Sequence, residues 1–487
     1  MLQVVDIPSD RLFIGGEWRP PRSGETFEDI DPGTGAVISR VARASKDDVD
    51  DAIAAARRAY PNWSKRSPTE RGALIRKWAE LIRESRDELA AIEARDVGKP
   101  LSAARLNIDV AAGNLEYAAG LADKVMGVTL PSRSTDHAGF TWREPWGVSG
   151  MILAWNVPAI MLCSGVGPAI AAGNTIVVKP SELAPLVSLA LTGLSASAGI
   201  PPGVINVITG IGSEAGAALT SHRGVDHISF VGSTHTGRTV MKAAAENLVP
   251  VRLELGGKSP NVVFADADLD QALPVILDSI TENAGQNCYA GSRLLVEASI
   301  YDEVVERLAD ASTRVRIGLW NEDLDMGPLI SEAQYQRVLG YINSGVSEGA
   351  RIVAGGPAAD ERLSSGWFVK PTLFDNVGAA MRISREEIFG PVLAAQPFRD
   401  TAQAIELVDS VPFGLLVAVW TNDLSRALNV ARQVHSGQVS INEFSNTNII
   451  GLPFNVAKES GFNHGAGYNI LHEFTQEKAV TIRLFDC

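Results

Sequence analysis

The chain has 487 residues, enough for about three domains of ~150 residues each. Hydrophobic residues make up 45% of it and charged residues 21%, which is the composition of a globular protein and not of a disordered or fibrous one. The 43 Lys and Arg residues are outnumbered by 57 Asp and Glu residues, so the formal net charge is −14. No long basic run offsets that balance, and we therefore expect no nucleic-acid partner.

The three cysteines, Cys163, Cys288 and Cys487, are too few and too scattered for a disulfide framework. They indicate a reducing compartment, and the N-terminus lacks the basic and apolar regions of a signal peptide, so we expect a cytoplasmic protein. An uncharged stretch from Pro145 to Val178 is long enough to cross a bilayer. Prolines, asparagines and glycines interrupt it, so we interpret it as buried strands and a helix and expect no contact with a membrane.

Two helices are predicted after a β-rich beginning. Ser45 with Asp48 is a cap for a helix over Lys46–Tyr60. The segment Ser-Pro-Thr-Glu at 67–70 is a capping box with proline at the first helical position, and it predicts one long helix towards Asp96. Apolar residues recur in that helix at spacings of three and four, which indicates one buried face.

From residue 147 onwards, short apolar runs alternate with helical ones. This alternation is typical of a mostly parallel α/β sheet. The first block predicts strands at Gly147–Trp155, Thr175–Lys179, Val204–Thr209, His227–Val231 and Val251–Leu255, with helices at Pro158–Ala172, Leu183–Ala198, Ser213–Leu219 and Thr234–Asn247. A second block predicts strands at Asn261–Phe264, Arg293–Glu297 and Val439–Asn442, with helices at Tyr301–Val315 and Ser331–Ser347.

Two segments fit neither block. The residues from Val128 to Trp146 are expected to form an extended excursion. The tail Lys478–Leu484 has a strand-like pattern and could pair with that excursion or with the edge of another subunit. The paired glycines Gly256 and Gly257 weaken either regular structure, which predicts a domain boundary there.

Cys288 is the strongest candidate for chemistry. It lies in Gly-Gln-Asn-Cys-Tyr-Ala-Gly-Ser-Arg, residues 285–293, just before a predicted strand. A thiolate nucleophile needs an accessible position and close approach of the substrate to the backbone, and flanking glycines permit both. Taken alone, the pattern leaves a buried structural cysteine open, but Cys163, inside an apolar helical run, fits that interpretation better.

Chemistry of a cysteine on a carbonyl group needs a base and an oxyanion donor. Glu254 ends a predicted strand among apolar neighbours, and desolvation there would raise its pKa towards the range of a general base. A carboxylate paired for structural reasons is the alternative. Asn156 lies at a corner between a strand and a helix, where a side-chain amide can point at an oxyanion. An isolated asparagine at such a place could also be a turn residue.

A nucleotide site is suggested although the G-x-G-x-x-G fingerprint is absent, because Gly210–Gly216 is one residue too long for it. The segment Phe-Val-Gly-Ser-Thr-His-Thr-Gly at 230–237 leads a strand into a helix whose first amides could receive a pyrophosphate. Lys179 and Glu182 close another strand, where they could bond ribose hydroxyls; a carboxylate there would repel a 2′-phosphate and favours NAD over NADP. The spacing of the histidines matches no metal site.

Six motifs together resemble the aldehyde dehydrogenase superfamily, in order and spacing, over nearly the whole chain. They are Trp155-Asn156, Lys-Pro-Ser-Glu at 179–182, the 230–237 segment, Leu-Glu-Leu-Gly-Gly-Lys-Ser-Pro at 253–260, the 285–293 segment and Glu-Glu-Ile-Phe-Gly-Pro-Val at 386–392. The resemblance implies that Cys288 adds to an aldehyde to form a thiohemiacetal whose oxyanion the Asn156 amide and the Cys288 N–H hold. Hydride then passes to NAD, and Glu254 activates the water that hydrolyses the thioester.

The resemblance also implies an architecture and a cofactor site. It suggests a Rossmann-like NAD domain (1–127 and 147–256, with a return at 456–472), an α/β catalytic domain (257–455) and a small β oligomerisation arm (128–146 and 473–487). It therefore predicts a homodimer or homotetramer. The implied cofactor contacts are Lys179 and Glu182 at the adenosine ribose, Gly232 and Ser233 at the pyrophosphate, and Trp155, Glu387 and Phe389 nearer the nicotinamide.

The chain departs from the superfamily pattern late in the sequence. Asn455-Val456 stands where two glycines are usual, and Asn463-His464-Gly465 lacks the usual Arg-Glu pair; Ala154 replaces a proline. These changes put in doubt the packing near the substrate mouth and the subunit contacts there, and Cys487 has no assigned role.

The substrate positions suggested by the resemblance are mostly apolar and could equally be ordinary core. They are Val157, Ile160, Met161, Ser164, Tyr289 and Phe444. None is an arginine or lysine, and Ser164 replaces a bulky aromatic residue, so we expect a medium or large, apolar or aromatic aldehyde. Three other readings stay open: an enzyme that transfers the acyl group to CoA, a member that has lost catalysis and serves as a binding protein, and a cofactor-independent cysteine hydrolase. The presence of Glu254 argues against the first.

Overall fold

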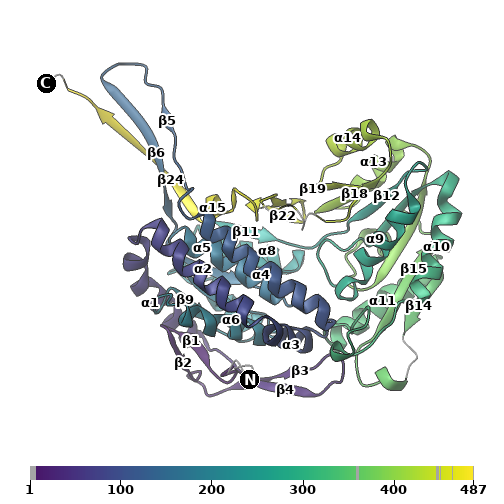
Figure 1. Ribbon diagram of the computed structural model, residues 1–487, viewed down its shortest axis with the longest axis horizontal. Coiled ribbons are helices and arrows are strands. Elements are labelled where there is room, and N and C mark those ends of the chain that lie inside the picture. The colour runs from purple at the N-terminus through teal and green to yellow at the C-terminus, as the bar shows by residue number, and fades with distance from the viewer. Residues whose placement is uncertain (1–6, 358–360, 446–448, 450, 463, 486–487) are drawn as a thin grey trace.

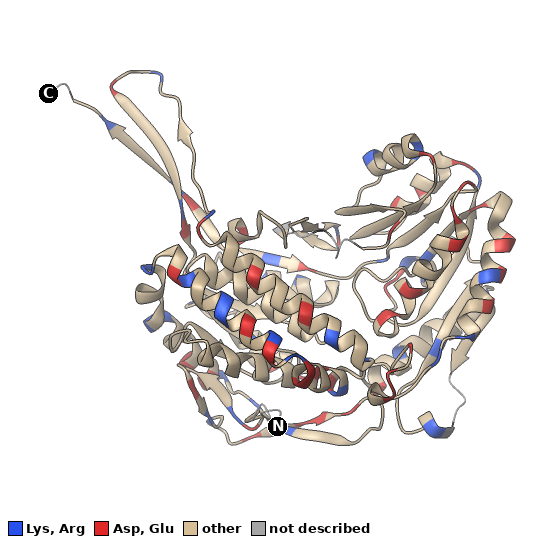
Figure 2. Cartoon of the chain, in the orientation of Figure 1, with Lys and Arg blue, Asp and Glu red and all other residues tan. Residues whose placement is uncertain are grey.

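The computed structural model describes residues 7–357, 361–445, 449, 451–462 and 464–485. It contains two large sheets, each covered by helices, and a narrow three-stranded sheet that extends away from the rest of the molecule (Figure 1). Figure 2 shows acidic and basic residues interspersed along the helices that face the viewer. No described helix has both the length and the apolar character needed to cross a membrane.

The first sheet has eight strands in the order β2-β1-β9-β8-β7-β10-β11-β22. Its central strands are parallel, while β1 and β22 pair antiparallel at the two sides. The strands are β1 Leu12–Ile14, β2 Glu17–Arg19, β7 Val148–Ile152, β8 Thr175–Lys179, β9 Ile205–Val207, β10 His227–Val231, β11 Val251–Glu254 and β22 Gly461–Phe462. The chain order reverses at β7, and this is where ligands bind in open α/β sheets.

Eight helices of the described chain belong to this half of the molecule (Figure 1). They are α1 Lys46–Ser64, α2 Pro68–Glu84, α3 Arg86–Val97, α4 Leu101–Leu121, α5 Pro158–Ala171, α6 Leu186–Ser197, α7 Ala217–Thr220 and α8 Thr234–Ala245. Both predicted capping boxes are present, at Ser45 and at Ser67. The apolar face of α2 is buried through Ile75, Trp78 and Ile82.

The prediction of a single long helix from Pro68 towards Asp96 is wrong. Ser85 has φ −98° and ψ 15°, so the backbone leaves the helical conformation there and two helices, α2 and α3, result. Other boundaries also differ: α6 begins three residues later than expected, after Pro185, because proline suits the start of a helix. The short segment expected to be helical at Ser213–Leu219 is a π-type turn, Gly212–Gly216, followed by α7.

The second sheet has seven strands in the order β14-β15-β16-β13-β12-β18-β19. Only β14 is antiparallel to its neighbour. The strands are β12 Pro260–Val263, β13 Arg293–Glu297, β14 Arg351–Pro357, β15 Val369–Asp375, β16 Val392–Phe398, β18 Leu416–Trp420 and β19 Gln438–Ile441. The main helices are α9 Leu269–Thr281, α10 Tyr301–Thr313, α11 Glu332–Ser347, α13 Thr401–Asp409 and α14 Leu424–Gln433, with the single turn α12 Arg382–Arg385. Helices α4 and α9 were not among the predicted elements.

The three-stranded sheet confirms one of the two pairings expected for the tail. Strand β24 Thr475–Arg483 pairs antiparallel with β6 His137–Pro145 along its whole length, and β5 Thr129–Leu130 pairs with the other side of β6. We call these three strands the arm; Figure 1 shows them projecting from the body. Small two-stranded ladders complete the fold: β3 Thr26–Ile30 with β4 Val37–Ala42, β17 Phe413–Gly414 with β21 Ala457–Lys458, and β20 Phe454–Asn455 with β23 His464–Gly465, beside the turn α15 Ile470–Glu473.

Candidate functional site

Four of the predicted site positions lie at one edge of the first sheet. Strands β8, β7, β10 and β11 are parallel neighbours, so their carboxyl ends meet at the same edge. Lys179 ends β8, Asn156 follows β7, Gly232 follows β10 and Glu254 ends β11. The sheet therefore brings together residues that lie up to 98 positions apart, as the motif order predicts.

Cys288 follows a backbone segment with an unusual conformation. Asn283, Ala284 and Gly285 have φ of 50°, 54° and 69°, a left-handed run between α9 and the cysteine. Such a run is unfavourable for residues with a Cβ atom and persists only where its surroundings hold it. A Cβ on Gly285 would lie 2.4 Å from the carbonyl oxygen of Gly390, so this glycine is required for close packing.

The turn at Gly256 and Gly257 connects the two sheets and lies against both Cys288 and Glu387. A Cβ on Gly257 would lie 2.3 Å from the carbonyl oxygen of Cys288, and one on Gly256 would lie 2.3 Å from Oε2 of Glu387. The N–H of Gly257 donates to Glu387 Oε1 at 3.1 Å. The glycines therefore let Glu254, Cys288 and Glu387 approach one another, which side chains at 256 and 257 would prevent.

The acidic groups of this cluster have perturbed pKa values. Burial, followed by the charges of Glu254 and Glu387, raises the pKa of the Cys288 thiol well above its usual value. Burial also raises the pKa of Glu254, and it raises that of Glu387 to about 7. The half-buried thiol is thus protonated at neutral pH in the free protein, next to a carboxyl group whose raised pKa suits a general base.

Glu254 has both a partner and a raised pKa. Its Oε2 accepts a hydrogen bond from Arg252 Nη2 at 3.2 Å, and Arg252 Nη1 donates to Ser229 Oγ at 3.1 Å. The carboxylate is therefore paired, yet burial outweighs this pairing in setting its pKa. Arg252 is two residues earlier on the same strand, so both side chains lie on one face of β11.

Asn156 lies at the corner between β7 and α5 and is 3% exposed. Its carbonyl oxygen accepts from Lys99 Nζ at 2.9 Å and from Asn283 Nδ2 at 3.0 Å. Its side-chain Oδ1 is buried and, among the described residues, meets no hydrogen-bond donor. Buried amide oxygens usually accept a hydrogen bond, so the side chain of Asn156 keeps its orientation without the partner that such a group ordinarily has. The sequence prediction missed Lys99 and Asn283; a lysine next to Gly98 and Pro100 gave no sign of burial.

The nucleotide positions form a second group at the same edge. Lys179 is 2% exposed, its Nζ lies 2.6 Å from Glu182 Oε2, and Glu182 Oε1 accepts from the N–H of Gly212 at 3.2 Å. Ser233 caps α8 by accepting from the N–H of Thr236 at 3.2 Å. A Cβ on Gly232 would overlap the ring of Phe230, so this position needs a glycine. Residue 232 therefore places no side chain in front of α8.

The rings of Trp155 and Phe389 meet edge to face, with centroids 5.3 Å apart. Phe389 has φ 60°, which is rare for a residue with a side chain and holds its ring towards Trp155. Two of the expected nicotinamide-side residues are therefore brought into contact although 234 positions separate them in the sequence.

The predicted substrate positions on α5 share one face. They are half-buried, whereas the neighbouring residues Pro158, Ala159, Leu162 and Cys163 are buried; the half-buried set is Val157, Ile160, Met161 and Ser164. Cys163 is fully buried, and burial raises the pKa of its thiol, in agreement with a structural role.

Beside Cys288, the ring of Tyr289 lies 6.3 Å from that of Phe444 and 6.4 Å from that of Phe454, measured between centroids. The phenol of Tyr289 donates to Glu282 Oε2 at 3.4 Å. Glu282 and Phe454 were not among the predicted pocket residues; the sequence gave no signal that an acid lies beside these rings.

The two stretches that depart from the superfamily pattern lie together. Phe454 and Asn455 pair with Gly465 and His464 in the β20–β23 ladder, and a Cβ on Gly437 would lie 2.1 Å from the carbonyl oxygen of Asn455. Asn463 and Cys487 lie outside the described residues.

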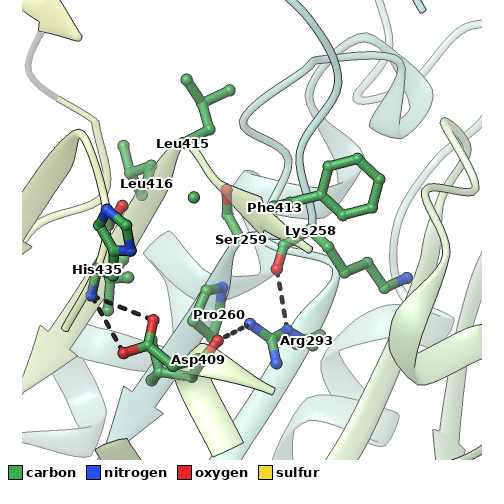
Figure 3. Close-up of a pocket in the computed structure, with 13 residues that line it drawn as sticks. Lys258, Ser259, Pro260, Arg293, Asp409, Phe413, Leu415, Leu416 and His435 are labelled. Atoms are coloured by element: carbon green, nitrogen blue, oxygen red, sulfur yellow. Dashed lines mark hydrogen bonds between the residues drawn. The ribbon is translucent and has the colours of Figure 1, made fainter. Parts of the chain in front are cut away.

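A small cavity lies beside Lys258, directly after the turn at Gly256 and Gly257. Its volume is about 10 Å³, close to the minimum for one water molecule, and Lys258, Ser259, Arg293 and Asp409 are among the residues that border it (Figure 3). Arg293 donates to the carbonyl oxygens of Lys258 at 2.9 Å, Leu407 at 2.7 Å and Val408 at 2.9 Å. Arg293 comes shortly after Cys288 in the chain, and Lys258 comes directly after Gly257. The hydrogen bond from this guanidinium to the carbonyl oxygen of Lys258 therefore holds the segment of Cys288 against the turn at Gly256 and Gly257.

Comparison with known proteins identifies the class. A family profile described as "Aldehyde dehydrogenase family" matches residues 18–480. An aldehyde dehydrogenase of Alternaria alternata is 44% identical over 98% of this chain and 95% of its own length. Retinal dehydrogenase 2 of Mus musculus is 41% identical over 99% of this chain and 93% of its own.

Solved structures agree. The NAD+ complex of an aldehyde dehydrogenase from Bacillus cereus matches with a TM-score of 0.95 and 41% identity, over 98% of this chain and 97% of that one. A betaine aldehyde dehydrogenase variant from Staphylococcus aureus, in complex with NAD+, matches with a TM-score of 0.96 and 36% identity, over 98% of each chain. The chain therefore belongs to the aldehyde dehydrogenase family, has the α/β fold of that family, and is an enzyme of the class that oxidises aldehydes to acids.

Proposed function

We propose that this protein oxidises an aldehyde to its carboxylic acid with NAD, through a covalent intermediate on Cys288. The observation that carries the proposal is the turn at Gly256 and Gly257, which lies against Cys288 and Glu387 directly after Glu254. A nucleophile, a carboxyl base and the oxyanion candidate Asn156 thereby converge from two sheets and one helix corner. Family membership supports the same reaction class.

The first step is the addition of Cys288 Sγ to the aldehyde carbon. The thiol is protonated in the free protein, so it must lose its proton as the S–C bond forms, and Glu254 is the group placed to accept it. To do so, Glu254 releases Arg252 and turns towards the thiol. The carbonyl oxygen becomes an oxyanion, which the Asn156 amide and the Cys288 N–H stabilise by hydrogen bonds.

NAD, when bound, would supply the hydride acceptor, and loss of hydride from the thiohemiacetal carbon would leave a thioester on Cys288. Glu254 passes the thiol proton to solvent and then takes a proton from a water molecule whose oxygen adds to the thioester carbon. The C–S bond breaks, Cys288 leaves as the thiolate, and the acid is released. A raised pKa makes Glu254 a stronger base than an exposed glutamate, which is what this hydrolytic step needs.

The residues present fit NAD. The first turn of α8 offers free N–H groups to a pyrophosphate, and Gly232 and Ser233 leave that approach clear. Lys179 and Glu182 form a fixed pair that would bond the adenosine ribose, and the carboxylate would repel the 2′-phosphate of NADP. Glu387, Phe389 and Trp155 would lie at the nicotinamide side, where Glu387 would bond the second ribose.

For the substrate, we propose a medium or large aldehyde with an apolar or aromatic body. The half-buried face of α5 and the rings of Tyr289 and Phe444 are the surfaces that would contact it. The carboxyl group of Glu282 lies beside those rings and would repel an aldehyde that carries a carboxylate. A panel of short, long, aromatic and carboxylate-bearing aldehydes, assayed by NADH absorbance, tests this; a preference for the carboxylate-bearing members would refute it.

We also propose the domain roles that the resemblance implies. Residues 1–127, 147–256 and 456–472 would bind NAD and 257–455 would carry the catalytic cysteine, while 128–146 and 473–487 form the arm. The arm exposes Trp142 and Ile482 as well as the free edges of β5 and β24, which suits pairing with another copy of the chain. We propose a homodimer or homotetramer, which sedimentation of the full chain and of a chain lacking 473–487 would test.

The decisive experiment compares the wild type with Cys288→Ala, Glu254→Gln and Asn156→Ala. We expect no NADH from Cys288→Ala, a slowed first turnover as well as slow steady-state turnover from Glu254→Gln, which lacks the base for both steps, and slow burst kinetics from Asn156→Ala. An absolute requirement for CoA would show acyl transfer to a thiol instead of hydrolysis. No rise in melting temperature on adding NAD would support a cofactor-independent hydrolase, since a ligand bound only by the folded state must stabilise it.

A further inference from the structure

The corner that carries Asn156 is held by a buried ion pair from a distant part of the chain. Glu93 lies near the end of α3 and Lys99 in the connection between α3 and α4. Their side chains are 0% and 1% exposed, and Lys99 Nζ lies 2.8 Å from Glu93 Oε1. A buried pair of this kind loses its hydration, so it is a weak choice for stability alone.

The two charges contact the main chain on both sides of Val157. Lys99 Nζ donates to the carbonyl oxygen of Asn156 at 2.9 Å, and Glu93 Oε2 accepts from the N–H of Ala159 at 3.3 Å. That N–H belongs to the first turn of α5, where the N-cap residue, Val157, supplies no side-chain cap. The carboxylate of Glu93 therefore caps α5 from another helix, at the end of the helix where a negative charge is favourable.

The nucleophile segment shares the same carbonyl group. Asn283 Nδ2 donates to the oxygen of Asn156 at 3.0 Å, and Gln286 Nε2 donates to the oxygen of Asn283 at 3.0 Å. The position of Asn156 relative to the segment that leads to Cys288 is thus set by two donors on one acceptor. Loss of the Lys99 donor would leave the carbonyl oxygen of Asn156 with Asn283 as its one side-chain donor among the described residues.

We propose that Lys99 and Glu93 are positioning residues for the oxyanion step: they fix the main chain at Asn156 so that its amide reaches the oxygen of the group bound to Cys288. The inference rests on the proposed function of Cys288 and Asn156. Neither charge touches the reacting atoms. A small displacement of an oxyanion donor weakens its hydrogen bond in the transition state, so the pair acts on rate and not on the binding of NAD.

The test measures acylation of Cys288 by p-nitrophenyl acetate, which needs no cofactor. The variant is Glu93→Gln with Lys99→Met, which removes both charges and avoids leaving one of them buried alone. The amplitude of the nitrophenol burst counts the active sites, so the burst rate refers to folded protein only. We expect this rate to fall at least about tenfold, against ~100-fold or more for Asn156→Ala, with KM for NAD unchanged.

Arg71→Met is the matched control. Arg71 is also buried and donates to the oxygen of Ala171 at 3.0 Å, at the opposite end of α5. We expect it to lower the melting temperature and leave the burst rate within about twofold of the wild type. Lys99→Arg, which keeps the charge and a donor, should recover part of the rate lost in Lys99→Met.

Two results would overturn the inference. One is a wild-type burst rate in the double variant while Asn156→Ala is slow; the other is an equal loss in Arg71→Met, which would mean that loosening α5 anywhere has the same effect. If the double variant does not fold, Glu93→Gln alone decides by the same rate. The proposed function fails separately, if the burst survives in Cys288→Ala or if Asn156→Ala acylates as fast as the wild type.

Discussion

Arg293→Met should destabilise the protein strongly and slow catalysis, although Arg293 touches no substrate position. Its guanidinium is fully buried, and burial lowers its pKa to about 9. It donates to three carbonyl oxygens at 2.7–2.9 Å, those of Lys258, Leu407 and Val408. Met fills the aliphatic part of the space but donates nothing to these oxygens.

The expected loss follows from those contacts. The oxygen of Leu407 keeps a second donor, Ser410 Oγ at 2.7 Å, whereas Lys258 and Val408 lose the donor that Arg293 supplied. At ~1–3 kcal/mol for each buried acceptor left unsatisfied, two acceptors cost about 2–6 kcal/mol. The adjoining cavity of about 10 Å³ has room for about one water molecule at most.

Urea denaturation followed by tryptophan fluorescence measures the change in the free energy of unfolding. The control is Arg307→Met on α10, where an exposed arginine pairs with Asp270 and its removal should cost about 0–1 kcal/mol. We also expect a slower p-nitrophenyl acetate burst in Arg293→Met, because the segments of Cys288 and Gly257 lose their common attachment. A loss no greater than that of Arg307→Met, with a normal burst, would refute the role assigned to Arg293.

Three further predictions follow from the charges. Because burial and two carboxylates raise the pKa of Cys288, alkylation of the free protein by iodoacetamide should rise about tenfold per pH unit from pH 7, and Glu387→Gln should speed it at pH 7; a plateau below pH 8 would contradict this. Burial lowers the pKa of His227 from 6.5 to about 3, so below pH 6.5 only the unfolded chain takes up its proton. Stability should therefore fall by up to ~1.4 kcal/mol per pH unit as the pH drops from 6.5 towards 3, and His227→Phe should remove that slope in acid denaturation; an unchanged slope would show that other groups cause it. Glu182→Gln should raise KM for NAD and lower KM for NADP, as measured by NADH and NADPH formation, and an unchanged preference would place 2′-phosphate discrimination elsewhere.

Where a residue carries a local signal, the sequence predicted its position in the fold. Lys179 and Glu254 end predicted strands, and parallel pairing of β8 and β11 with the strands between them brings those ends to one edge. The paired glycines at 256 and 257 predicted a boundary, and the turn there does pass from one sheet to the other. These inferences needed only strand periodicity, turn chemistry and the rule that parallel strands share an edge.

Residues that act through distant contacts had no such signal. Lys99 and Asn156 are 57 positions apart, and a charged residue between two helices is ordinarily solvated. The break at Ser85 was hidden because the apolar pattern continues across it. The arm strands β6 and β24 lie more than 300 positions apart, so only the structure decides which of the possible edges they share.

The proposed nucleophile and its proposed partners belong to different sheets, and this explains where the buried charges are. Cys288 precedes β13 of the second sheet, whereas Asn156 and Glu254 follow strands of the first. A shift of one sheet against the other would separate them, since only the turn at Gly256 and Gly257 connects Glu254 to β12 along the chain. The guanidinium of Arg293 bonds that turn to the second sheet. Asn283 bonds the main chain of Asn156 to the segment that leads to Cys288, and Lys99 donates to the same carbonyl oxygen. Buried charges that lose their hydration therefore lie where two separate sheets must keep the proposed reacting groups in register.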